Sequence, residues 1–396
     1  MSNQQFDGNF YIGRLYDLQA DQLTQKPVLY DPDDLTTHGV VVGMTGSGKT
    51  GLCIDILEEA ALNGIPALLI DPKGDIGNLL LHFPSLSPED FQPWIDPDEA
   101  RRDGKSIAEA AAQTAEIWRD GLEKWDIQPE RIQRVKDAVE YAVYTPGSDA
   151  GLPISIVSTL AAPPLSWEQE RELLREKISS TVTALLSLVD IDADPMRSRE
   201  HILLANIFEE AWKNKRDLTL TELILQVQNP PLEKLGAFEV EQFFPADDRM
   251  ALATQLNSLL ASPAFQAWME GEPLDPERLL WTPEGEPRQT VFYLAHLSDR
   301  ERMFFVTLLL SAVESWMRTQ PGSPSLRALI YFDEVAWFPA SGEGTSLQGA
   351  LDAYVQASAC IRRRHAFGYA KSRRSRLQSF EQCRDMVRRP AANGAR

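Results

Sequence analysis

A glycine-rich run near the start of the chain carries residue types that bind phosphate. Residues 43–50 read GMTGSGKT and fit the pattern G-x-x-x-x-G-K-[ST], the Walker A motif. Its glycines let backbone N–H groups close around a phosphate with no Cβ in the way. Lys49 would reach the β- and γ-phosphates, and the Thr50 hydroxyl would ligate Mg²⁺. The predicted cofactor-binding residues of this run are Gly43, Thr45, Gly46, Ser47, Gly48, Lys49 and Thr50.

Two carboxylates follow an apolar run further along the chain. Residues Arg327–Phe332 end in Asp333 and Glu334, the pattern of a Walker B strand. Asp333 would hold Mg²⁺ through water, and Glu334 would orient and polarise the water that attacks the γ-phosphate. Such a strand end alone is often only solvated, but the phosphate-binding run in the same chain favours the functional interpretation. We therefore predict Glu334 and Lys49 as catalytic residues, and Thr50 and Asp333 as metal ligands.

A charged turn, Asp71-Pro72-Lys73-Gly74-Asp75, follows a third apolar run. It is either an ordinary turn or a site that senses nucleotide or couples it to a partner. We assign Asp71 to the cofactor-binding residues and leave the choice open. His201 falls on a predicted helix without a partner motif, so we give it no catalytic role.

The order of local patterns predicts how these residues are positioned. The β-branched run His38–Val42 predicts a buried strand that enters the loop directly, and Thr50–Asn63 has the apolar spacing of a helix. Pro66–Ile70 predicts a second strand. Strands are also predicted at Val291–Leu294 and at the run that ends in Asp333, so parallel strands should bring their carboxyl ends to one edge.

Helix-start signals mark the remaining segments. Capping boxes are predicted at Ser166 with Gln169, for a helix to Val189; at Thr219 with Glu222, for a helix through Val227; and at Ser298 with Glu301, for the helix Asp299–Arg318. The tryptophans fall largely on these helices, where we expect packing roles. The fold class is α/β, with a mostly parallel sheet and a large helical insertion. The predicted divisions are a first core part (1–82), the insertion (83–287), a second core part (288–343) and a basic tail (344–396).

Composition limits the classes of protein. The 396 residues carry a net charge of -19, which disfavours a protein that coats nucleic acid over its whole surface. The three cysteines have no paired spacing, so neither a zinc site nor a disulfide framework is indicated. We find no membrane-spanning run and no secretory signal, which makes the cytoplasm the expected compartment.

The chain resembles the HerA/FtsK superfamily of P-loop ATPases, and specifically the HerA-like ATP-binding proteins. The resemblance rests on GMTGSGKT, DPKGD and YFDE in this order, and on the blocks His38–Leu81, Ser198–Asn206 (SREHILLAN) and Ala295–Leu310 (AHLSDRERMFFVTLLL). It implies a P-loop NTPase fold of the RecA/FtsK type over about residues 10–343, with ATP and Mg²⁺ as cofactors. By motif, it carries phosphate and magnesium roles to Lys49 and Thr50, the metal role to Asp333 and the catalytic role to Glu334.

Members of this group are hexameric ring motors that hydrolyse ATP and pump DNA, so the resemblance implies a DNA translocase or helicase. Two departures stand out. Only some forty residues precede the loop, where HerA has an N-terminal β-barrel, and no Thr-Gln sensor pair follows Glu334. Two alternatives stay open: a non-motor regulatory switch that signals through the helical insertion, and an inactive, monomeric fragment that only binds nucleotide.

The tail, residues 344–396, differs from the rest of the chain in the sign of its charge. Residues 344–396 hold 11 Lys+Arg and 3 Asp+Glu, whereas residues 1–343 hold 28 and 55. When the reading frame is shifted by one base, the codons of Met386-Val387 can encode only Trp. In the same frame, the codons of residues 368–373 can encode Ala-Thr-Gln-Asn-Pro. That reading resembles the missing sensor segment. We therefore predict a frameshift near residue 344 that truncates a family member, with a solvated nucleic-acid-binding arm as the alternative.

Overall fold

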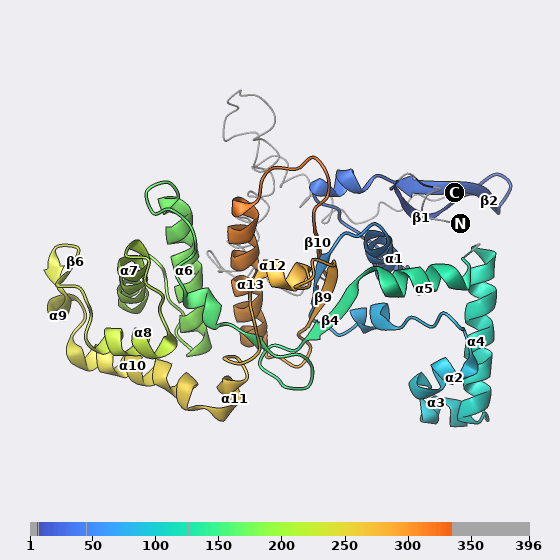
Figure 1. The fold of residues 1–396 in the computed structure, drawn as a ribbon. Helices are drawn as coiled ribbons and strands as arrows, with labels where there is room; N and C mark the ends of the chain where they lie inside the picture. The colour runs from blue at the N-terminus through green and yellow to red at the C-terminus, as the bar shows by residue number, and fades with distance from the viewer. Residues whose placement is uncertain (1–5, 7, 45, 126, 335–396) are drawn as a thin grey trace, which may run out of the picture.

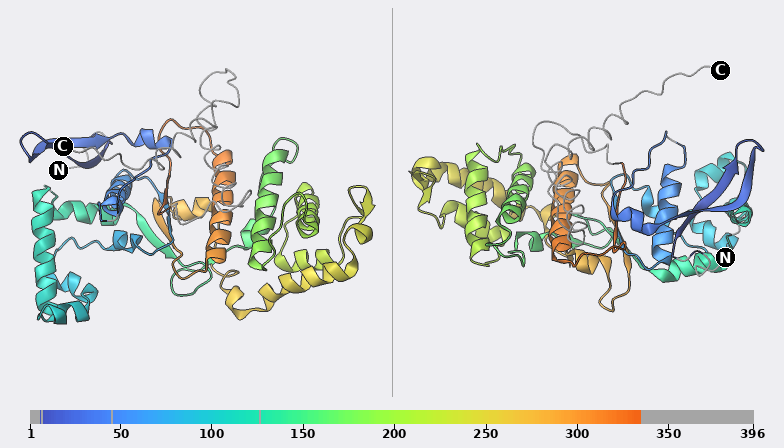
Figure 2. Two further views of the ribbon diagram at one scale, coloured as in Figure 1. Left: turned by 180° about the vertical axis from the view of Figure 1, so that it is seen from behind. Right: turned by 90° about the horizontal axis from the view of Figure 1, so that it is seen from above.

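The computed structural model describes residues 6, 8–44, 46–125 and 127–334. A central sheet separates two groups of helices (Figure 1). Figure 2 shows from two further sides that the group formed by residues 88–138 and the group formed by residues 171–266 lie on opposite sides of that sheet. The predicted tail at 344–396 lies outside the described residues.

The central sheet has four strands, and every neighbouring pair is parallel. Their order is β10 (Leu329–Phe332), β3 (Ala67–Asp71), β9 (Arg288–Tyr293) and β4 (Glu140–Tyr144). All five residues of β3 are buried, as expected for an inner strand of a parallel sheet covered on both faces. The α/β class with a parallel sheet is confirmed.

Helices cover both faces of this sheet. Helix α1 (Lys49–Leu62) packs its buried Leu57 with Leu69 and Val291 of the sheet. On the other face, α13 (Asp299–Thr319) brings Phe305 to within 5.3 Å of the Phe292 ring, measured between centroids. These two apolar layers bury the sheet between α1 and α13.

The remaining elements lie around this core. An N-terminal hairpin pairs β1 with β2, and two further pairs of short strands join β5 with β8 and β6 with β7. Their bounds are β1 (Phe10–Asp17), β2 (Gln22–Tyr30), α2 (Pro88–Phe91), α3 (Pro97–Arg102), α4 (Ile107–Lys124), α5 (Pro129–Ala138), β5 (Ile154–Ser155), α6 (Arg171–Leu188), α7 (Arg199–Lys213), α8 (Leu220–Gln228), β6 (Lys234–Leu235), β7 (Phe238–Glu239), α9 (Val240–Phe243), α10 (Ala246–Ala261), α11 (Pro263–Gln266), β8 (Glu272–Pro273) and α12 (Pro276–Leu280).

Glu59 links helix α1 to the N-terminal hairpin and to α5. Its carboxylate accepts a hydrogen bond from the Tyr11 backbone N–H at 3.1 Å and forms an ion pair with Arg131. Glu59 is only 2% exposed, so both partners are needed to compensate its buried charge. The hairpin is thereby fastened to the back of α1.

One predicted strand is wrong, and one strand of the sheet was not predicted. The run His38–Val42 is not a strand in the structure, and Val40 and Val42 are 77% and 76% exposed. A strand needs a hydrogen-bonded neighbour, and within the described residues β10 is the outer strand, paired only with β3. Conversely, β4 joins the sheet beside β9, although it lies inside the interval that we predicted as mainly helical.

Two of the three predicted capping boxes are confirmed. Thr219 with Glu222 and Ser298 with Glu301 exchange the expected pair of hydrogen bonds at the starts of α8 and α13. The prediction for Ser166 is wrong, because a turn intervenes: the Glu170 N–H bonds to the Ser166 carbonyl, and α6 begins only at Arg171.

No helix in the described part of the chain is long and apolar enough to cross a membrane.

Candidate nucleotide site

The glycine-rich loop needs its glycines for conformational reasons. Gly46 and Gly48 have φ angles of 76° and 87°, in the left-handed region that strains other residues. At Gly43, an added Cβ would lie 2.4 Å from the Ser47 Oγ, so a side chain here would force the Ser47 hydroxyl to move. Thr45, which also belongs to the predicted set, lies outside the described residues.

Lys49 and Thr50 are the first two residues of α1, directly after the loop. The Lys49 ammonium bends back over the loop and donates a hydrogen bond to the Met44 carbonyl at 2.9 Å. The Ser47 N–H bonds to the same carbonyl at 3.1 Å. A helix start presents unpaired N–H groups and the positive end of the helix dipole, so this corner suits an anion.

Tyr331 lies between Asp333 and helix α1. Its hydroxyl donates a hydrogen bond to the Asp333 carboxylate at 2.7 Å, and it lies close enough to the Cys53 thiol of α1 to affect the pKa of that thiol. Cys53 follows Thr50 by three positions, so both side chains lie on one face of the helix. The structure therefore brings the predicted metal ligands Thr50 and Asp333 to neighbouring surfaces, although they come from opposite ends of the described chain.

Burial governs the protonation of Cys53 and Tyr331. Burial raises the pKa of the Cys53 thiol, and the nearby Asp333 carboxylate raises it further. Burial also raises the pKa of Tyr331, followed by its hydrogen bond to Asp333. Both groups are therefore neutral near pH 7. The Asp333 side chain beside them is buried, with 7% of its surface exposed.

Asp71 lies next to Asp333 at the carboxyl edge of the sheet. Ile70 of β3 pairs in register with Phe332 of β10, and the Asp333 N–H bonds to the Ile70 carbonyl at 3.0 Å. The Asp71 carboxylate accepts hydrogen bonds from the backbone N–H groups of Gly74, Asp75 and Ile76, at 2.7, 3.2 and 3.1 Å. Its side chain is therefore engaged within its own turn. Burial raises its pKa despite these donors. Its predicted contact with a cofactor stays a prediction.

Glu334 follows Asp333 in a strained conformation, with a φ angle of 46°. Its carboxylate forms an ion pair of 2.5 Å with the ammonium group of Lys73, from the turn after β3. The hydrogen bond to Glu334 is the main reason why the pKa of Lys73 is raised. About a third of each side chain is exposed, 31% for Lys73 and 39% for Glu334, so water reaches this pair.

Cofactor chemistry fits this set of residues. No group of three or more His, Cys, Asp and Glu side chains converges within the described residues in a way that would hold a metal by itself. Mg²⁺ commonly takes one or two protein oxygens and completes its shell with water and phosphate oxygens. Thr50 and Asp333 would supply such a pair, beside a loop whose glycines leave room for a phosphate.

Several features escaped the sequence reasoning. The approach of Tyr331 to Cys53 and the ion pair between Lys73 and Glu334 could not be expected, because they join segments whose contact depends on strand order. The contact of Tyr331 with Asp333 had a signal in the sequence, because residues two apart on a strand share one face. His201 has a structural role, as expected: it is 2% exposed and hydrogen-bonds Thr183 at 3.1 Å.

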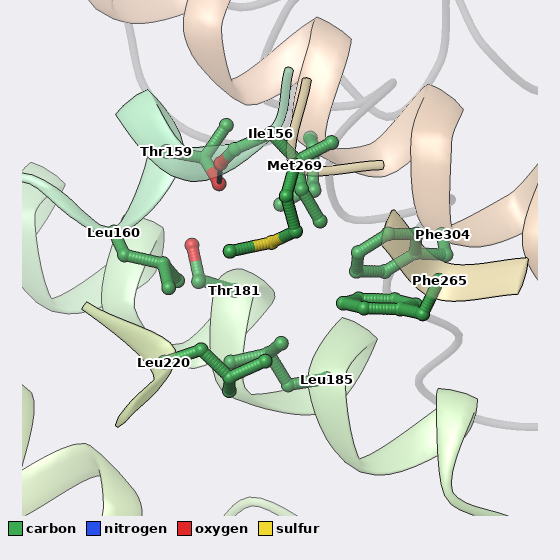
Figure 3. Close-up of a pocket in the computed structure, with 10 residues that line it drawn as sticks. Ile156, Thr159, Leu160, Thr181, Leu185, Leu220, Phe265, Met269 and Phe304 are labelled. Carbon is green, nitrogen blue, oxygen red and sulfur yellow. Dashed lines mark hydrogen bonds between the residues drawn. The ribbon is translucent and has the colours of Figure 1, made fainter. Parts of the chain in front are cut away.

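An enclosed apolar cavity lies away from this site, between α6 and α13 (Figure 3). Its volume is about 10 Å³, enough for roughly one water molecule. The residues that line it include Leu185, Phe304 and Leu308, all buried members of the main core. It is a packing void whose lining is apolar apart from the hydroxyl groups of Thr159 and Thr181, and the Thr159 hydroxyl donates to the Ile156 carbonyl at 2.6 Å.

Comparisons with known proteins give the family. No curated protein matches the chain. Among solved structures, VirB4 of Thermoanaerobacter pseudethanolicus is similar, with 13% identity and a TM-score of 0.45 over 90% of this chain and 74% of that one. Residues 10–313 match the family described as Helicase HerA, central domain. Since this match covers more than half of the chain, the protein belongs to that family, and it is a P-loop ATPase of the HerA type.

Proposed function

We propose that the chain binds Mg²⁺-ATP between the loop at 43–50 and the strand end at Asp333 and Glu334, and that this site hydrolyses the γ-phosphate bond. The observation that carries the proposal is the position of Tyr331, whose hydroxyl donates to Asp333 and lies near the Cys53 thiol of α1. Helix α1, which follows the phosphate-binding loop, therefore lies beside the strand that leads to the two carboxylates.

The residues have separate tasks in this proposal. Lys49 exchanges its bond to the Met44 carbonyl for phosphate oxygens, and the backbone N–H groups of the loop hold the phosphate chain. Thr50 and Asp333 hold Mg²⁺, which neutralises phosphate charge when it is bound. Glu334 orients the attacking water and accepts its proton. Tyr331 keeps Asp333 in place, because its hydroxyl occupies one of the two carboxylate oxygens.

We further propose that copies of the chain assemble in the cytoplasm as a hexameric ring that moves DNA, as the HerA family suggests. One observation weighs against DNA as the partner: residues 1–343 carry an excess of acidic groups, with 55 Asp+Glu and 28 Lys+Arg. This excess favours the second candidate, a regulatory switch that binds ATP and signals to a protein through its helical part.

One set of measurements separates these functions. ATP turnover is measured with and without duplex DNA at two salt concentrations, beside light scattering for the mass of the assembly, with Lys49→Ala as the binding-deficient control. ATP turnover that DNA stimulates, by a hexamer, supports the DNA motor. Nucleotide-dependent binding of a protein partner, without stimulation by DNA, supports the regulatory switch. A monomer that binds ATP but does not hydrolyse it supports the inactive fragment. Equal ATP binding by Lys49→Ala and the wild type would overturn the site assignment itself.

A further inference from the structure

The ion pair between Lys73 and Glu334 occupies the carboxylate that the proposed reaction needs. A general base must turn toward the water from which it accepts a proton. In this structure the Lys73 ammonium group lies 2.5 Å from Oε1 of Glu334 and holds that carboxylate toward the turn after β3, and Glu334 adopts a strained backbone conformation with a φ of 46°. The arrangement therefore suits a resting state better than a reacting one.

Lys73 also borders the proposed phosphate and metal site. It lies two residues after Asp71, whose strand pairs with the strand that ends in Asp333. Its ammonium group is close enough to interact electrostatically with Asp333 and Asp75 as well as with Glu334. Because both partners of the ion pair are about a third exposed, water screens the pair and it can open. A terminal phosphate in this corner would carry more negative charge than one carboxylate and would compete for the ammonium group.

We infer that Lys73 is a positioning residue that holds Glu334 in the empty site and is drawn to the terminal phosphate of a bound nucleoside triphosphate, which releases Glu334 for water activation. The inference rests on the proposed function and deepens it, because it makes the site respond to the third phosphate. A diphosphate lacks the group that competes with Glu334, so it leaves the ion pair intact.

The test uses binding, which does not depend on turnover. Dissociation constants for ATPγS and ADP are measured with Mg²⁺ by calorimetry on the full chain, on Glu334→Gln, on Lys73→Met and on the double variant. Removal of the competing carboxylate in Glu334→Gln should tighten ATPγS binding about two- to fivefold, the range of an exposed ion pair, and leave ADP binding unchanged. Lys73→Met should weaken ATPγS selectively. In the double variant, the gain from Glu334→Gln should disappear.

Two controls make the result specific. Lys26→Met removes an exposed lysine from the hairpin and should change neither constant. Lys73→Arg keeps the charge and should keep the preference for ATPγS, which guards against misfolding of Lys73→Met. A gain from Glu334→Gln that is equal for ADP, or that persists in the double variant, would reflect general charge repulsion and overturn the inference. Absence of all nucleotide binding would instead overturn the proposed function, and this inference with it.

Discussion

Glu58 gives the sharpest prediction about stability, because two neighbours and its burial act on one titration. The pKa of Glu58 is raised from 4.5 to about 7: burial is the main cause, the nearby Asp55 adds to it, and Arg131 opposes both. Burial likewise raises the pKa of Asp55 to about 6. A carboxyl group whose pKa is higher in the folded protein binds its proton more tightly there. Its contribution to stability is therefore complete below pH 4.5 and is lost as the pH rises to about 7.

The change to test is Glu58→Gln, which replaces the titrating group by a neutral one of the same shape. A shift from 4.5 to about 7 corresponds to at most about 3 kcal/mol. Since the side chain is partly exposed, solvent screening reduces this figure, and we expect about 1–2 kcal/mol. At pH 8 the variant should be more stable than the wild type by this amount. At pH 4, where the glutamic acid is mostly protonated in both the folded and the unfolded chain, the two proteins should have similar stability.

Urea unfolding at pH 4 and pH 8, followed by circular dichroism, measures this difference. The difference between the two proteins is used, because titrating groups that are remote from Glu58 affect both of them alike. Comparable m-values in all four experiments are required. A Glu58→Gln protein that is less stable at pH 8, or a difference that does not change with pH, would refute the reasoning.

The remaining predictions concern the site, the core and the gene. Lys49→Ala should lose most of its Mg²⁺-ATP affinity, and Glu334→Gln should keep binding but lose turnover; calorimetry and a phosphate-release assay check both, and unimpaired turnover by Glu334→Gln would contradict its role. Mg²⁺-ATP at a hundredfold excess over its Kd should stabilise the folded chain by about 2.7 kcal/mol, seen as a higher melting temperature; no shift would speak against an intact site. Leu57→Ala, in the fully buried layer between α1 and the sheet, should cost about 2–5 kcal/mol in chemical unfolding. Resequencing the gene should show that the frame shifted by one base after residue 343 encodes Thr-Gln-Asn-Pro; any other reading there would refute the frameshift.

Local patterns predicted most of the core that positions the site. The strand at Ala67–Asp71, helix α1 and the strand before Asp333 follow from apolar spacing and from glycine or charged residues at their ends. The two confirmed capping boxes follow from residues three apart. Each of these signals is contained in a few consecutive residues, so the sequence alone expresses it.

Predictions that depend on a distant partner were less accurate. The run Val40–Val42 has the composition of a strand, but composition cannot supply a neighbour for its hydrogen bonds. The short β4 gains its place from pairing with β9, and its five residues resemble many loop segments. The contact of Lys73 with Glu334 likewise depends on the adjacency of β3 and β10. Strand order is a property of the assembled sheet, which explains why these features could not be predicted.

The order of the central sheet has a consequence for synthesis on the ribosome. Ala67 of β3 pairs with Gln289 of β9, so 222 positions separate the partners. At about 5–20 residues per second, roughly 10–45 s pass between their emergence, and β10 follows later still. During this interval the apolar faces of β3 and α1 have no sheet to cover them. We therefore expect the nascent chain to need a chaperone until residue 293 has emerged, and its core to form late and from distant contacts.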